Sequence, residues 1–448
     1  MPGAAPRPRT APAPRTAPDR PRIVALAFAA LGATAGCTEP DAGGAGAAVR
    51  DSAGIRIVEN VTATAARCSV SAAPTLDIGM IEGPQEYQLY RVFDAATLSD
   101  GRIAVVNQGS DEIRVYSPDG IFQHSFGSQG EGPGEFRQVF RVWLGAADTL
   151  IVGDYRPYRF SFFTPEGEYI RSVQPEPVYV NNPNSLGTMS DGTYVFAYDD
   201  PRLPEREGEW VDVTQEVILH DASGAMIDTL AVLPYGRVGW TDLELRSAGR
   251  PLFEAVSHVA AGGDRLVIGR GVERELEVFE LRADEPLESA PPGTTPTPRI
   301  DLGRPGSIIR WSGPDRTVTD ADVEEYRRLL REAAADADSD LGRRFIEAEL
   351  SADRPVAERF PPHAAVELGA GGEIWVQQSA GVAAYDPNRE PRTEWLVFDR
   401  AGRLECRVTL PFARSYDIFE LGADHVLGKF EDDLGVEHVR RYALMHPR

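Results

Sequence analysis

The sequence has little cysteine, little histidine and no excess of positive charge. Its 448 residues include three cysteines and seven histidines, and the formal net charge is −23. This charge argues against a nucleic-acid partner, because phosphate binding needs a positive surface. The histidines are dispersed without a metal-ligand spacing, and the chain contains no nucleophile elbow, phosphate-binding loop or Cys-x-x-Cys motif. We therefore predict no cofactor and no catalytic or metal-ligand set.

The chain also lacks a hydrophobic run long enough to cross a bilayer. Residues 1–22 are basic and rich in proline, and the apolar run that follows covers only residues 23–31. This layout is typical of a secretory signal peptide. Ala35 and Gly36 directly before Cys37 resemble a bacterial lipobox, although Thr34 stands where lipoboxes usually carry leucine.

The resemblance implies cleavage after residue 36 and lipid attachment to the Cys37 thiol. An ordinary signal peptide cut nearby is the alternative. We expect residues 1–36 to be a lipoprotein-type signal peptide. Residues 37–54 are rich in alanine, glycine and aspartate and are expected to form a flexible tether.

The rest of the chain repeats short apolar strands separated by Asp-Gly and related turns. Asp100-Gly101 and Asp119-Gly120 lie between alternating hydrophobic runs, a setting in which Asp-Gly predicts a β-hairpin. Four short antiparallel strands make one blade of a β-propeller. The pattern predicts an all-β, six-bladed propeller over residues 55–446, with blades at 92–126, 139–173, 185–230, 257–302, 364–410 and 415–445.

The last blade contains only three predicted strands, and a segment before the first blade can supply the fourth. Residues 76–87 echo residues 125–136, which places residues 75–78 as an outer strand. A strand borrowed from the N-terminus closes the ring and removes an open edge. Cys68 and Cys406 would then lie in neighbouring blades, where a disulfide would pin the closure. Two buried free thiols are the alternative.

One segment breaks the β pattern. Thr319 offers a helix N-cap, and apolar residues then recur at helical spacing, as they do again over residues 341–350. We expect a helical insertion at about residues 317–352, between blades four and five. This insertion, a polar insertion at 199–215 and the loop at 127–136 would emerge on one face, where we expect the partner to bind.

The loop at 130–136, Gly-Glu-Gly-Pro-Gly-Glu-Phe, follows a strand that ends in Phe-Gly. Together with the turns punctuated by Asp-Gly, it resembles NHL-like six-bladed β-propeller proteins, many of which are secreted bacterial lipoproteins. The similarity covers roughly residues 51–444. It implies a binding scaffold and no defined reaction, with lyases and lactonases among more distant propellers.

The most suggestive residues for ligand binding follow the second strands of three blades, on the face that carries the insertions. They mix aromatic rings with guanidinium groups, which suit carboxylates or sugars. Solvent-exposed loop charges without a binding role are the alternative. The predicted residues are Asp154, Tyr155, Arg156, Tyr158 and Arg159 in blade two, Arg270 and Arg274 in blade four, and Gln377 in blade five.

Arg91 and Arg141 occupy matching places on innermost strands, where they could line the channel. We expect them instead to pair with neighbouring acids.

These observations predict an extracytoplasmic, lipid-anchored and monomeric binding module in a bacterial periplasm or on the cell surface. Its expected partners are an envelope protein, a peptide or a glycan, and the membrane through the lipid anchor. We expect no catalysis. The alternative is a hydrolase or lactonase with a divalent cation such as Ca²⁺ at the channel mouth, held by carboxylate and carbonyl oxygens.

Overall fold

The computed structural model describes residues 47–156, 158–175, 184–200, 202–206, 208–280, 304–314, 316–335, 339–350, 354–386, 392–412 and 417–447. The predicted signal peptide and Cys37 lie outside these residues. None of the helices within the described ranges is long and apolar enough to span a membrane. The prediction of a mostly β protein built from several sheets is confirmed.

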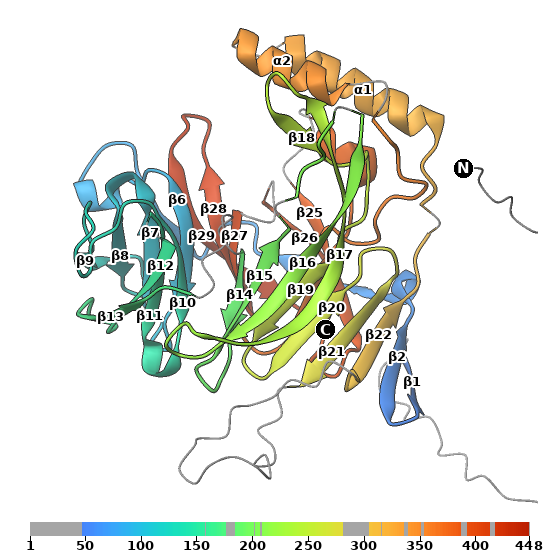
Figure 1. The fold of residues 1–448 in the computed structure, drawn as a ribbon. Coiled ribbons are helices and arrows are strands. Elements are labelled where there is room, and N and C mark those ends of the chain that lie inside the picture. The colour runs from blue at the N-terminus through green and yellow to red at the C-terminus, as the bar shows by residue number, and fades with distance from the viewer. Residues whose placement is uncertain are drawn as a thin grey trace, which may run out of the picture. The chain divides into compact units, whose positions relative to one another are not determined.

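The described strands form six sheets, which we number 1 to 6 along the chain (Figure 1). Sheets 1 and 2 each hold four antiparallel strands in chain order. The first Asp-Gly turns form as predicted, because Gly101 and Gly120 take positive φ angles of 86° and 80°. The strands are β6 (Val92–Thr97), β7 (Ile103–Asn107), β8 (Glu112–Tyr116) and β9 (Phe122–Phe126), then β10 (Val139–Leu144), β11 (Leu150–Tyr155), β12 (Tyr158–Phe163) and β13 (Tyr169–Val173).

Sheet 3 is larger than the sequence suggests. Residues 210–215, which we placed in a polar insertion, belong to the long strand β16, and its partner β17 extends beyond the predicted hairpin to Asp242. Their pairing buries Val213 and Leu233, which explains why this part of the insertion is ordered as a ribbon. The strands are β14 (Asn184–Thr188), β15 (Tyr194–Asp199), β16 (Trp210–His220), β17 (Met226–Asp242) and β18 (Ser247–Gly249).

Sheet 4 contains six strands, two of which come from the N-terminal segment. Its fourth strand, β22, lies beyond residue 302, where we expected the blade to end. The predicted outer loop at 282–298 lies outside the described residues. In sheet order the strands are β19 (His258–Gly262), β20 (Arg265–Gly269), β21 (Glu275–Glu280), β22 (Ser307–Trp311), β2 (Ile55–Asn60) and β1 (Ala47–Ser52).

Sheets 5 and 6 are also completed by short N-terminal strands. Sheet 5 adds β3 to its outer edge, and the outer strand of sheet 6 consists of β4 and β5, which both pair with β29. The strands are β23 (Ala365–Leu368), β24 (Ile374–Gln377), β25 (Thr393–Phe398), β26 (Leu404–Leu410) and β3 (Ala66–Arg67), then β27 (Ile418–Leu421), β28 (His425–Glu431), β29 (Glu437–Met445), β4 (Ser69–Val70) and β5 (Leu76–Ile78).

The first strands of the six sheets, β6, β10, β14, β19, β23 and β27, are here called the inner strands. Contacts join β6 to β10, β10 to β14, β14 to β19, β19 to β23, and β27 back to β6. Between sheets 5 and 6, the N–H of Ala370 donates to the carbonyl oxygen of Leu421 over 3.1 Å. Each sheet thus meets the next, and the last meets the first. This arrangement is consistent with a β-propeller.

The N-terminal segment crosses the outer edges of three successive sheets. β2 lies parallel to β22 in sheet 4, β3 lies parallel to β26 in sheet 5, and β5 lies antiparallel to β29 in sheet 6. The pairing of β5 with β29 is the one that the sequence echo predicts. Residues 47–52, which we placed in the flexible tether, form β1 instead, because they pair with β2 along its whole length.

A disulfide joins Cys68, directly after β3, to Cys406 in β26, with an S–S distance of 2.08 Å. Both cysteines are buried in the apolar cluster shared by sheets 5 and 6. The bond therefore links the N-terminal segment to sheet 5 immediately before the chain enters sheet 6.

Two helices follow β22 and precede β23: α1 (Asp320–Ala335) and α2 (Asp340–Glu349). Thr319 and Asp322 bond to each other's backbone N–H at the start of α1, and the Ser339 hydroxyl accepts from the N–H of Gly342 in α2. Tyr326 of α1 packs against Phe253, with ring centroids 5.5 Å apart. Short 3-10 helices are η1 (Thr62–Thr64), η2 (Gln85–Tyr87), η3 (Gln108–Ser110), η4 (Ala146–Asp148) and η5 (Gly381–Tyr385).

Candidate functional site

Asp154 and Arg159, the buried acid and base of the predicted cluster in blade two, form hydrogen bonds and an ion pair within the protein. Asp154 is fully buried and accepts hydrogen bonds from the backbone N–H groups of Arg137, Gln138 and Arg156. Arg159, also buried, lies 3.6 Å from Asp154 and donates to the carbonyl oxygens of Glu131 and Glu135. These contacts hold the glycine-rich loop at 130–136 against sheet 2.

The aromatic members of this cluster also pack internally. Tyr155 stacks on Phe140 with ring centroids 4.0 Å apart, and Tyr158 stacks on the same ring at 6.0 Å. Burial raises the pKa of both tyrosines. Arg156 is exposed, so it is the one side chain of the five that stands in solvent. Tyr155 alone among them lines the cavity described below.

The remaining predicted residues do not join this cluster into a shared site. Arg270 is exposed and pairs with Glu277 over 2.7 Å. Arg274 donates to the carbonyl oxygen of Pro314, and Gln377 is half-buried at the end of β24. None of the three lines the cavity.

The inner strands surround a central cavity of about 790 Å³, and each of the six contributes to its lining. This volume lies within the range of small-molecule sites in proteins. The lining includes Asp264, Gly372 and Arg400 from turns at the ends of strands. These turns emerge opposite the face on which we expected the partner, so the cavity reaches toward the other face.

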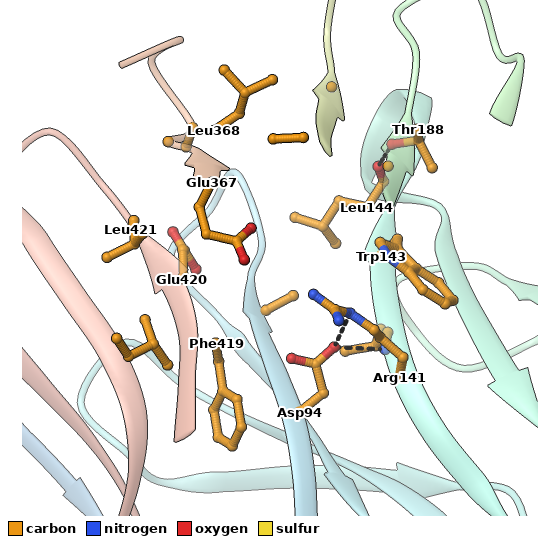
Figure 2. Close-up of a pocket in the computed structure, with 18 of the residues that line it drawn as sticks. Asp94, Arg141, Trp143, Leu144, Thr188, Glu367, Leu368, Phe419, Glu420 and Leu421 are labelled. Atoms are coloured by element: carbon orange, nitrogen blue, oxygen red, sulfur yellow. Dashed lines mark hydrogen bonds and ion pairs between the residues drawn. The ribbon is translucent and has the colours of Figure 1, made fainter. Parts of the chain in front are cut away.

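Asp94 of β6 and Arg141 of β10 form an ion pair in the cavity wall (Figure 2). The Arg141 Nε atom lies 3.5 Å from Asp94 Oδ2, and the same oxygen accepts from the N–H of Val142 over 3.0 Å. Asp94 is only 5% exposed. Burial raises the pKa of Asp94 to about 6, although Arg141 and the backbone N–H act in the opposite direction. Arg141 therefore both pairs with an acid and lines the channel.

Glu420 of β27 is held as an anion at the side of the cavity. One of its oxygens accepts from the N–H of Thr97 over 3.0 Å, and the other lies 3.1 Å from His425 Nε2. Burial would raise the pKa of Glu420, but the hydrogen bonds from His425 and Thr97 outweigh it and lower the pKa. The same hydrogen bond raises the pKa of His425.

Glu367 of β23 differs from the other acids. Its side chain points into the cavity, toward the space between Arg141 and Glu420 (Figure 2). Within the described ranges, no hydrogen bond or ion pair engages its carboxylate. The surrounding protein raises its pKa by desolvation, and Arg141 lowers it only in part.

The other charged groups in the lining have opposite charges beside them. Lys429 lies 3.8 Å from Asp417 and 3.7 Å from Glu437. At the rim, Arg400 pairs with Asp264 over 2.5 Å and Arg265 pairs with Glu280 over 2.9 Å.

The wall formed by β14 and β19 is small and uncharged. Gly187 and Thr188 face Ala260, Ala261 and Gly262 in the lining. A Cβ atom at Gly187 would collide with the carbonyl oxygen of Ala261, so glycine is required for this close approach. The cavity therefore has one charged side and one flat, largely apolar side.

Sequence reasoning missed Asp94, Glu367 and Glu420. Each is a single acid within a short apolar inner strand, which is an unfavourable place for a charge unless it is paired or faces water. A lone acid in such a strand is therefore the signal in the sequence that marks these three positions.

Among the described residues, the group of acids, histidines and cysteines close enough to share a metal ion is Cys68, Cys406 and His446. Its two sulfur atoms are already joined in the disulfide. The carboxylates of the cavity do not form such a group. Within the described residues, the cavity therefore offers no group of three such side chains for the divalent cation of the alternative prediction.

The chain matches no protein-family model and no curated protein. Solved structures with a similar arrangement include a candidate exported protein from Bacteroides fragilis, with 9% identity, a TM-score of 0.44, and coverage of 88% of this chain and 100% of that one. A member of the duf4221 family from Bacteroides vulgatus has 10% identity, a TM-score of 0.43, and coverage of 85% and 99%. Virginiamycin B lyase from Staphylococcus aureus has 12% identity, a TM-score of 0.32, and coverage of 82% and 83%. At these identities and TM-scores, the similarities assign neither a family nor an activity to this chain.

Proposed function

We propose that this protein is an exported, lipid-anchored, six-bladed β-propeller that acts as a non-catalytic binding module, with its ligand held in the central cavity. The observation that carries the proposal is the cavity of about 790 Å³, into which charged side chains from separate sheets converge. A protein interior is normally close-packed, so a cavity of this size with charged walls indicates a binding site.

The closed series of inner-strand contacts supports the six-bladed architecture, with sheets 1 to 6 as the blades. The pairing of β5 with β29 supplies the outer strand of the last blade, and the insertion of α1 and α2 falls between the fourth and fifth. In such a ring, the inner strands fix the cavity walls from all sides.

Export is supported by two independent features. The basic segment, the short apolar run and the small residues before Cys37 have the layout of a lipoprotein signal. The Cys68–Cys406 disulfide suits an oxidising, extracytoplasmic compartment. Incorporation of a labelled fatty acid into the wild-type protein, and its loss in Cys37→Ala, would test the anchor.

The size of the cavity narrows the range of partners. A free small molecule, a terminal sugar or one side chain of a peptide would fit into about 790 Å³, whereas a folded protein would contact only the rim. The loop residues Asp154 and Arg159 are occupied by internal bonds, so we move the proposed site from that loop into the cavity.

Hydrolysis is the second candidate, and Asp94 is the observation that favours it. A carboxyl in a cavity with a pKa raised to about 6 resembles a general base. Turnover of lactone or ester substrates that is lost in Asp94→Asn would establish this alternative.

The binding function is tested with the low-molecular-mass fraction of a bacterial envelope extract. The purified wild-type protein should retain a component detectable by native mass spectrometry. Thr188→Trp, which places an indole at the cavity wall, should not retain it. Val272→Trp is the matched control, because residue 272 is 70% exposed and does not line the cavity. Equal retention by all three proteins would contradict a cavity site.

A further inference from the structure

We propose that the central cavity selects a small organic cation, and that the carboxylate of Glu367 binds the ammonium group of this ligand. The proposal rests on the proposed function and adds the chemical class of the ligand. It follows from the one charge in the cavity that the protein leaves unmatched.

Glu367 differs from the other charged residues of the lining, each of which has an oppositely charged side chain beside it. Asp94 has Arg141, Glu420 has His425, and Lys429 has Asp417 and Glu437. At the rim, Arg400 forms an ion pair with Asp264, and Arg265 forms one with Glu280. Only Glu367 faces the cavity without an opposite charge in contact within the described residues.

Glu367 is solvent-exposed, and a carboxylate without an opposite charge beside it is stabilised in its charged form by a bound cation. Arg141 lies on β10, whose neighbouring inner strands are β6 and β14, and it already pairs with Asp94. A ligand with an ammonium group would supply the missing charge and the hydrogen-bond donors together. A carboxylate ligand would instead meet Asp94, Glu367 and Glu420 in a protein with a net charge of −23.

The geometry favours an organic cation over a metal ion. A hard divalent cation takes about six to eight oxygen ligands at short distances. Within the described residues, Glu367 belongs to no group of three or more acid, histidine or cysteine side chains close enough to share an ion. The cavity is also far larger than an ion needs, so most of its volume would hold the uncharged body of the ligand.

The wall formed by β14 and β19 suits that uncharged body. Gly187, Ala260, Ala261 and Gly262 present backbone and methyl groups without charge. Trp143 adds an aromatic ring beside Arg141. An amine attached to a ring or a short hydrocarbon would place its charge on Glu367 and its body against this wall.

Protons should compete with the ligand for Glu367. The carboxylates of Asp94 and Glu420, the guanidinium of Arg141, the imidazole of His425 and the ammonium of Lys429 are the charged groups around it. Desolvation raises the pKa of Glu367, so acid protonates it earlier than an ordinary glutamate. Amine binding should weaken as the pH falls through this raised pKa, while the amine itself stays protonated.

The test uses matched ligands that differ in charge: benzylamine against benzoate, cyclohexylamine against cyclohexanecarboxylate, and glucosamine against glucose. Ligand-observed NMR at about 10 mM detects dissociation constants in the millimolar range. We expect at least one amine to bind the wild-type protein and its anionic or neutral counterpart to bind about tenfold or more weakly.

Glu367→Gln should lose the preference for the amine and its dependence on pH. Glu244→Gln is the matched control, because Glu244 is 90% exposed and outside the cavity lining, and it should change neither. Thr188→Trp should abolish binding altogether.

The outcomes separate the two proposals. If benzoate, cyclohexanecarboxylate or glucose bound as tightly as the amines, and Thr188→Trp abolished this binding, the proposed cationic ligand would be wrong and the proposed binding function would still hold. Amine binding that Glu367→Gln leaves unchanged would overturn the role of Glu367. Absence of binding by every amine would overturn this inference, whereas retention of an envelope component would still support the proposed function.

Discussion

Two groups of charged residues in this protein are similar in composition and differ in the hydrogen-bond and ion-pair partners that the protein gives them. The first is the loop group, Asp154, Arg156 and Arg159, whose buried acid accepts three backbone N–H bonds and whose buried base holds two carbonyl oxygens. The second is the cavity group, Asp94, Arg141, Glu367 and Glu420, which comes from four separate inner strands.

The two groups differ in whether each charged side chain has a partner within the protein. Asp154 and Arg159 pair with each other, and Arg159 donates to a carbonyl oxygen of the loop at 130–136, so their charges stabilise this loop. In the cavity group, Glu367 lacks an opposite charge and the pKa values of Asp94 and Glu367 are raised. Charged residues that the backbone satisfies contribute to stability, and charged residues left unmatched in a cavity are available for binding.

Removing the buried acid of the loop group should produce the largest effect. Asp154→Ala leaves three N–H groups without their acceptor and removes the ion pair with Arg159, so we expect a loss of about 3–5 kcal/mol in the free energy of unfolding. Urea denaturation measures this loss. Arg156→Ala, at the exposed position of the same loop, is the control and should change stability by less than about 0.5 kcal/mol. A stable Asp154→Ala protein would break the contrast between the two groups.

Removing the Cys68–Cys406 disulfide should lower the stability almost as much, and it changes no residue of the loop group or the cavity group. Cys68→Ala/Cys406→Ala removes the link between the N-terminal segment and sheet 5, and we expect a loss of about 2–5 kcal/mol. The bond lies at the outer strands, away from the cavity lining. At a temperature where the variant remains folded, amine binding should therefore be retained. Treatment of the wild-type protein with a reductant should reproduce the loss of stability.

The pH dependence of stability reports directly on Asp94. Its folded pKa, about 6, lies above the ordinary value of 3.8, so its favourable contribution is complete below about pH 4 and is lost as the pH rises through 6. The full span corresponds to about 3 kcal/mol. Asp94→Asn, whose amide oxygen still accepts from Val142, should gain stability relative to the wild type between pH 4 and pH 8. A difference that stays constant with pH would show that Asp94 titrates normally.

The smallest effect on stability belongs to the residue with the largest proposed role in binding. Glu367→Gln removes a carboxylate that contacts no opposite charge among the described residues and whose pKa is raised by desolvation, so the variant should be no less stable than the wild type at pH 7. Thermal unfolding measured beside Asp154→Ala gives the comparison in one experiment. A large destabilisation by Glu367→Gln would reveal a structural partner for this side chain and would remove the contrast.

Local signals in the sequence account for much of the fold. Asp-Gly turns such as Asp100-Gly101 set hairpins because glycine readily adopts the positive φ that the turn needs. The echo of residues 125–127 at 76–79 placed β5, and helical spacing after Thr319 placed α1. These features depend on residues close together in the chain.

Features that depend on contacts between residues far apart in the chain could not be predicted from such local signals. The parallel pairing of β2 with β22 joins residues some 250 positions apart, and nothing within residues 47–60 indicates that edge. The cavity group likewise meets only because six inner strands converge. The sequence shows single acids in apolar strands. Only the fold shows that Asp94 pairs with Arg141 and that Glu367 has no opposite charge beside it among the described residues.

The most direct test is the affinity for benzylamine measured in Glu367→Gln and Arg156→Ala beside the wild type. Our account predicts that Glu367→Gln binds about tenfold or more weakly and that Arg156→Ala binds as the wild type does. The reverse result, with binding lost in Arg156→Ala and kept in Glu367→Gln, would contradict it and return the site to the loop.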